Sequence, residues 1–135
     1  MGGEIVALET AILAYTKAQV SQRTYAIKAP NGVAMPYIVF SVVSNNFIHV
    51  MGGDSGLSET RVQFSVFGDR YDQVKGDVEK LKKTYRNYIE GGGALMGGTE
   101  WVQSTLLGNE TDIYEDATDL FHTALDITFW HMEGD

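Results

Sequence analysis

The chain has no cysteine and only two prolines among its 135 residues. Without thiols it can form neither disulfide bonds nor thiolate metal sites, and a cysteine nucleophile is excluded. No apolar run approaches the roughly 18 residues that a membrane-spanning helix needs, and no basic segment precedes an apolar one at the N-terminus. We therefore expect no membrane partner, and a single domain, residues 1–135, that buries its core without cross-links.

Basic residues are missing from the last fifth of the chain. Residues 1–108 carry ten acids and ten Lys or Arg, whereas residues 109–135 carry eight acids and no Lys or Arg, which accounts for the net charge of −8. Proteins bind nucleic acid largely through Lys and Arg contacts with phosphates. The charge distribution therefore disfavours a DNA-binding module.

The central stretch, residues 36–67, predicts a long antiparallel hairpin. Its first half is a run of β-branched and aromatic residues, and in its second half Val62, Phe64 and Val66 alternate with polar residues, as in a half-buried strand. The connection, residues 52–56, contains three glycines and is longer than a two-residue turn. We expect a mobile loop at the tip of a projecting hairpin.

The rest of the chain predicts an α+β fold. Apolar residues recur at helical spacing in residues 4–16 and again after Asp69, a suitable N-cap, through residue 88. Residues 101–107 and 120–131 have strand patterns. The predicted order is α-β-β-α-β-β, with both helices on one face of a mostly antiparallel sheet of four strands, or five if residues 24–27 form another.

The last predicted strand has apolar residues on both faces. Phe121, Leu125, Ile127 and Phe129 share one side, and Trp130 falls on the other with His122 and Asp126. A monomer would leave Trp130 and the second apolar face of the hairpin in water, and exposed patches of this kind usually mark an interface. The predicted interface residues are Tyr37, Val39, Phe47, Val50, Met51, Asp54, Leu57 and Trp130.

We find no pattern typical of an enzyme, a cofactor site or a metal site. His122 and Asp126 lie about 13 Å apart on a strand, too far for a catalytic pair, so His49, His122 and His131 are interpreted as surface or interface residues. The glycine-rich residues 91–98 lack the ending of a phosphate-binding loop and predict a flexible connector. The acids at 112, 115, 116 and 119 lack the spacing of a calcium loop and predict a solvated acidic loop.

The order of these segments resembles the tail-completion, or tail-terminator, proteins of long-tailed bacteriophages and related prophage-derived particles. The resemblance covers residues 5–132, and no single motif is diagnostic, so the shared order and spacing carry it. The matching segments are APNGVAMPYIVFSVVS at residues 29–44, GLSETRVQFSVF at 56–67, the helix that begins near Tyr71, and DIYEDATDLFHTALDITFWH at 112–131.

This resemblance implies a structural protein of the virion, made in the host cytoplasm. Members of the family form a ring, generally a homo-hexamer, that caps the head-proximal end of the tail tube, stops its growth and offers a docking surface to the head connector. The implied partners are other copies of the chain, the tail tube protein and the head-completion protein. DNA would pass through without specific binding, along a lumen to which Glu110, Asp112, Glu115, Asp116 and Asp119 could contribute.

Two other functions stay open at the level of sequence. One is a small α+β binding module whose hairpin takes up a peptide or protein partner by strand addition. The other is an enzyme of unrecognised type with a pocket under residues 91–98. A mass measurement in solution and on tail tubes separates these from a ring protein.

Overall fold

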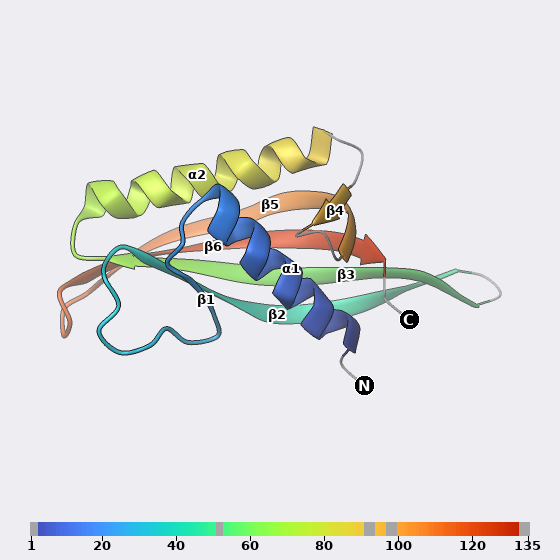
Figure 1. Cartoon of the computed structure of the whole chain (residues 1–135), viewed down its shortest axis with the longest axis horizontal. Coiled ribbons are helices and arrows are strands. Elements are labelled where there is room, and N and C mark those ends of the chain that lie inside the picture. Colours follow the sequence, from blue (N-terminus) through green and yellow to red (C-terminus); the bar gives the residue numbers. More distant parts are fainter. Residues whose placement is uncertain (1–2, 51–52, 91–93, 97–99, 133–135) are drawn as a thin grey trace.

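The computed structural model describes residues 3–50, 53–90, 94–96 and 100–132, and its layout is shown in Figure 1. These described residues form two helices and six strands. In order they are α1 (Gly3–Gln19), β1 (Thr24–Ala26), β2 (Tyr37–Val50), β3 (Gly53–Gly68), α2 (Tyr71–Glu90), β4 (Ala94–Met96), β5 (Glu100–Glu115) and β6 (Leu120–Met132). Within these ranges, neither helix has the length and apolar content needed to cross a membrane.

The strands form one sheet in the order β1-β2-β3-β6-β5-β4. β1 runs parallel to β2, and every other neighbouring pair is antiparallel. The predicted α+β class with two helices is confirmed, but the predicted order is incomplete. β1 confirms the optional fifth strand at residues 24–27, whereas β4 adds a strand that was not predicted, because its three residues are too few to show a period.

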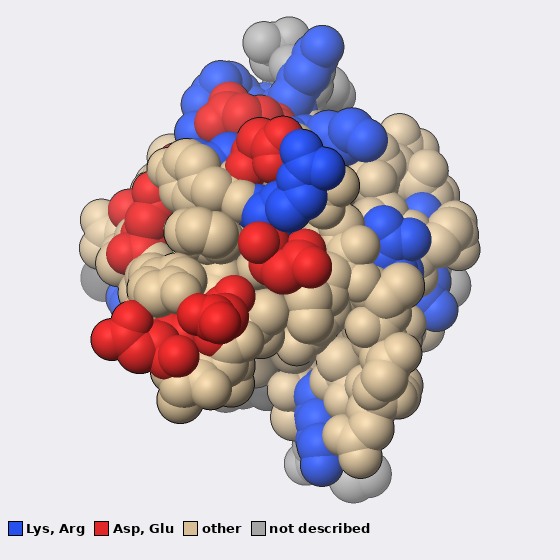
Figure 2. Space-filling model, turned by 90° about the vertical axis from the view of Figure 1, so that its left-hand side faces the viewer, with Lys and Arg blue, Asp and Glu red and all other residues tan. Residues whose placement is uncertain are grey.

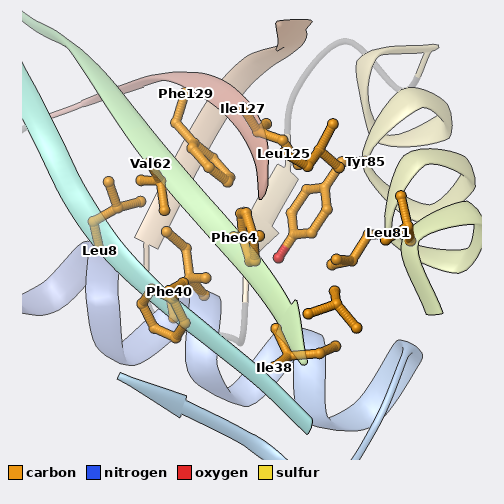
Figure 3. Packing of buried hydrophobic residues seen from close by; sticks show 14 of the residues in the cluster. Leu8, Ile38, Phe40, Val62, Phe64, Leu81, Tyr85, Leu125, Ile127 and Phe129 are labelled. Atoms are coloured by element: carbon orange, nitrogen blue, oxygen red, sulfur yellow. The ribbon is translucent and has the colours of Figure 1, made fainter. Parts of the chain in front are cut away.

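Both helices lie on one face of the sheet, as Figure 1 shows. They bury Leu8 and Ile12 of α1, and Val74, Val78 and Leu81 of α2, against the alternating inward residues of the long strands. Phe40, Phe64, Leu125, Ile127 and Phe129 supply the sheet side of this core (Figure 3). The spacing of apolar residues in the sequence therefore predicted correctly which side of each helix is buried.

Tyr85 of α2 lies at the centre of the core. Its ring centroid is 5.5 Å from that of Phe64 and 5.4 Å from that of Phe129, and its side chain is fully buried. Its hydroxyl lies 2.7 Å from the hydroxyl of Thr16 on α1, and its backbone carbonyl accepts a hydrogen bond from Thr105 of β5. One residue thus joins both helices to the sheet.

The predicted glycine loop at residues 52–56 is wrong. β2 and β3 stay paired as far as Val50 and Gly53, so the connection is residues 51–52, which lie outside the described residues. The hairpin does project, because β6 pairs with β3 only from Leu57 onward. Ladder hydrogen bonds come from the backbone, so a strand can continue through glycines where the side-chain pattern has ended.

The flexible connector predicted at residues 91–98 is also corrected in part. Residues 94–96 form β4, which pairs with β5 from Ala94 opposite Val102 to Met96 opposite Glu100. The remaining residues of that segment, 91–93 and 97–98, lie outside the described residues.

Two glycines near the start of α2 should respond in opposite directions to replacement by alanine. A Cβ atom at Gly68 would lie 2.8 Å from Cγ2 of Val74, so we expect Gly68→Ala to lower the free energy of unfolding by about 1–3 kcal/mol through overpacking. At Gly76, on the helix surface, a Cβ atom would meet nothing within 4 Å. Gly76→Ala should therefore raise the free energy of unfolding by roughly 0.5–1 kcal/mol. Urea denaturation of both variants checks this pair. Equal stability of Gly68→Ala and the unmodified chain would contradict the close packing of α2 on the end of β3.

Candidate functional site

In the described structure one side of the sheet carries no helix, and we call it the helix-free face. Its side chains alternate along each strand with those of the core, so that Tyr37 and Val39 of β2 point away from the neighbouring buried Ile38 and Phe40. Its other apolar or aromatic members include Phe67 of β3, Leu106 and Ile113 of β5, and His122 and Trp130 of β6. Leu106 is 56% exposed and Ile113 is 43% exposed. A single copy therefore leaves apolar side chains of this face in water.

An aromatic row crosses one end of this face. Tyr37, Phe67, His122 and Ile113 are successive partners across four strands. The Tyr37 and Phe67 rings stack with centroids 5.3 Å apart, and the Phe67 and His122 rings stack at 4.2 Å with an interplanar angle of 20°. Burial lowers the pKa of His122, an effect that the charge of Glu115 opposes. Burial in this stack therefore favours the neutral imidazole.

A groove adjoins the aromatic row. The segment after β1, residues 27–33 with Met35, forms one wall, and Tyr37, Val39 and Phe67 form the other. The volume is about 450 Å³. Ile27 and Met35 on its rim are both exposed, so the groove extends the apolar surface of this end.

The far end of the helix-free face carries Trp130, and a polar band separates it from the aromatic row. Leu106 borders this band, because it pairs with Thr128, which pairs with Arg61. In this band Arg61 of β3 lies 3.6 Å from the carboxylate of Asp126 on β6. The pair is exposed on the Arg61 side, so its contribution to stability is small. The face thus presents two apolar patches with a charged strip between them.

The predicted interface residues fall into two groups. Tyr37, Val39 and Trp130 share the helix-free face. Phe47 is 47% exposed, but a register shift between Val42 and Ser44 places it opposite the buried Ser58, on the other side of the sheet. Val50, Asp54 and Leu57 lie on the paired strands of the projecting hairpin, and Met51 lies outside the described residues.

Two of the five predicted lumen acids are held by α2. Glu110 accepts hydrogen bonds from Lys75 and Lys82, the latter at 2.9 Å. Asp112 accepts from the hydroxyl of Thr123 at 2.8 Å, from Tyr71 at 3.0 Å and from Lys75 at 3.2 Å. The hydrogen bonds from Lys75 and Lys82 lower the pKa of Glu110, and the bond from Thr123, followed by those from Lys75 and Tyr71, lowers that of Asp112. These two carboxylates therefore fasten β5 to α2.

The other three acids lie at the β5–β6 turn. Glu115 accepts a hydrogen bond from Thr118, and Asp119 accepts one from the hydroxyl of Tyr114. Asp116 is exposed. The predicted acidic loop is corrected, since Asp112 and Glu115 belong to β5, which stays paired with β6 as far as Glu115 opposite Leu120. Only residues 116–119 form the turn.

The histidine prediction is wrong for His131. Its side chain is fully buried, and its Nε2 lies 2.8 Å from the hydroxyl of Thr60 on β3. The register places His131 on the core side of β6, two residues beyond Phe129, where a neighbouring hydroxyl satisfies it. His122 is partly buried on the helix-free face, and the side chain of His49 lies outside the described part of the chain.

Comparison with known proteins shows a shared fold. Neither a protein-family model nor a curated protein matches the chain. A chain from the virion of a native gene transfer agent particle is similar with a TM-score of 0.60 and 15% sequence identity, over 96% of this chain and 91% of that chain. A protein from Akkermansia muciniphila, solved without its transmembrane region, has a TM-score of 0.38 and 7% identity over 98% of this chain and 56% of that one. At 15% identity the first likeness shows a shared fold and nothing more, and a TM-score of 0.38 is too low for the second to support an argument.

Proposed function

We propose that this chain is a structural protein of a phage-like particle, that it forms a ring on the head-proximal end of the tail tube, and that the ring stops tube growth and receives the head. The observation that carries this proposal is the helix-free face. A soluble monomer seldom leaves a row of aromatic residues and exposed Leu106 and Ile113 on one uncovered sheet face, because such surface usually belongs to an interface.

The shared fold supports the same class of function. The gene transfer agent chain is part of a virion, and the likeness spans nearly the whole of both chains. The segments that resemble tail terminators are spread over the same fold, in β2, β3, α2, β5 and β6. The proposed partners are further copies of the chain, the tail tube protein and the head-completion protein, in a virion assembled in the host cytoplasm. This role needs no catalysis.

The charge distribution is compatible with a ring through which DNA passes. Asp116 and Asp119, in the β5–β6 turn, are not paired with lysine in the described structure and remain for a lumen surface, whereas Glu110 and Asp112 are held by α2. Carboxylates repel phosphates, so such a lumen would let DNA pass without binding it. We propose six copies in the ring, as in the family that the sequence resembles.

The test is assembly on purified tail tubes. Negative-stain images should show extra density at one end of each tube, and tubes with this cap should stop growing when tube protein is added. Bare tube ends and unchanged growth would contradict the proposal. A monomer that instead binds extended peptides would favour the binding module, because β2 has no neighbour on one edge beyond Phe40 in the described structure.

A further inference from the structure

The two edges of the sheet carry opposite charges at the same level. Strand pairing aligns Thr24, Ile38, Val66, Thr123 and Asp112 in one row across five strands, and Ala26, Phe40, Phe64, Leu125 and Glu110 in another. Arg23 and Lys28 flank β1 at one edge, and residues 110–115 lie at the other edge. The basic and acidic segments therefore occupy matching heights on opposite sides of the subunit.

The charge of each edge is nearly unmixed. Residues 10–53 carry Lys17, Arg23 and Lys28 and no acid, whereas residues 109–119 carry five acids and no base. Arg23 and Lys28 are exposed. Among the described residues of the acidic edge, the lysines of α2 reach only Glu110 and Asp112. Figure 2, which views the end of the molecule at the left of Figure 1, shows most red side chains on the left and centre, with blue side chains beside them at the top, whereas the charged side chains at the right-hand side are blue.

Both edges also have unpaired backbone. β1 pairs only with residues 38–40 of β2, and β4 pairs only with residues 100–102 of β5. In the described structure, residues 41–50 of β2 and 104–115 of β5 have no neighbouring strand on their outer side. Free backbone donors and acceptors of this kind are a template for pairing with another chain.

The directions of the strands suit the pairing of one copy with the next. β2, β3, β6 and β5 alternate in direction, so β5 runs opposite to β2, and β1 runs with β2. A second copy rotated about an axis parallel to the strands keeps these directions. Its β1 and β2 would then lie antiparallel to β5 of the first copy, without inversion of the subunit. A contact between unlike edges is heterologous, and repeated rotation closes it into a ring.

We propose that a second copy of this chain docks edge to edge, with Arg23, Lys28 and the free edge of β2 of one copy against residues 104–115 of β5 of the next, so that the turn at residues 116–119 stays free for the lumen. This inference rests on the proposed ring and names the surfaces that form its seams. Opposite charge selects the orientation, and backbone pairing of the strand edges supplies further contacts.

The test uses a carbodiimide, which joins a lysine amine to a carboxylate in direct contact. Protein labelled with ¹⁵N and unlabelled protein are mixed in equal amounts, assembled on tail tubes and cross-linked, and linked peptides are identified by mass. We expect links of mixed isotope composition between Lys28 and acids of residues 110–115. Links between Lys75 and Glu110, which are bonded within one chain, serve as the internal control and should have uniform isotope composition.

A variant adds a second measurement. Lys28→Glu places like charges at the seam, so we expect assembly on tubes to weaken about tenfold or more, whereas Lys83→Glu, exposed on α2, should leave it unchanged. Capped tubes without mixed links from Lys28 would overturn the edge-to-edge seam and leave the ring function standing. Absence of any cap on the tubes, with uniform links only, would overturn both.

Discussion

Replacing Tyr85 by alanine should lower the free energy of unfolding by about 3–5 kcal/mol, the largest loss that we expect from any single change. The ring is fully buried and contacts Phe64 and Phe129, so its removal leaves a cavity between α2 and the sheet. The hydroxyl of Thr16, whose side chain is fully buried, also loses its partner. Urea denaturation followed by circular dichroism measures the loss.

Tyr71→Ala is the matched control, because Tyr71 is on the same helix but is 47% exposed. It loses a surface ring and the solvent-exposed hydrogen bond to Asp112, for which we expect a much smaller loss than for Tyr85→Ala. A similar small loss for Tyr85→Ala would show that α2 does not pack on the sheet through this residue. The position of β5 would then also be in doubt, since Thr105 of β5 bonds to the Tyr85 carbonyl.

The two helices and the long strands could be predicted from the sequence because each has a strong period. Val74, Val78, Leu81 and Tyr85 recur at three and four residues, and all four are buried. Val62, Phe64 and Val66 alternate, and they lie in the core as predicted. In these segments the local pattern and the tertiary packing agree.

The extent of the sheet could not be predicted in the same way. β1 and β4 are held by backbone bonds to longer neighbours, and β5 continues through Asn109 and Glu110 because β6 lies beside it. Asp112 and Glu115 look like loop residues by composition, but β6 and the lysines of α2 keep this segment extended. These segments are extended because they pair with strands and side chains that are distant in sequence. A local sequence pattern does not reveal such contacts.

The candidate site was predictable in part. Trp130 on the side of β6 opposite Phe129 follows from alternation alone, and so do Tyr37 and Val39 opposite Ile38. The aromatic row depends on the register that aligns Tyr37, Phe67 and His122, and the groove depends on the path of residues 27–35. The sequence held one signal for the ion pairs of Glu110 with Lys75 and Lys82. These two lysines lie seven residues apart and therefore on one side of α2.

Replacing Trp130 by lysine should impair attachment to the particle far more than it impairs folding. Trp130 lies on the helix-free face, where it is partly exposed and stands opposite Glu59 on β3, so a lysine there would face a carboxylate. We expect the free energy of unfolding to change by no more than about 1 kcal/mol. A desolvated tryptophan at an interface commonly contributes 2 kcal/mol or more to binding, so assembly on tail tubes should weaken by roughly 30-fold.

The matched control for this change is Gln73→Lys, which adds the same charge at an exposed position of α2 on the opposite side of the molecule. Sedimentation of protein with tail tubes measures binding, and urea denaturation measures stability for both variants. If Trp130→Lys loses its cooperative unfolding transition, Trp130 is needed for folding. The residue then belongs to the core and not to an interface. If it unfolds like Gln73→Lys and binds tubes equally well, the partner must cover another part of the subunit, and the apolar end of the face at Tyr37 and Phe67 becomes the next position to change.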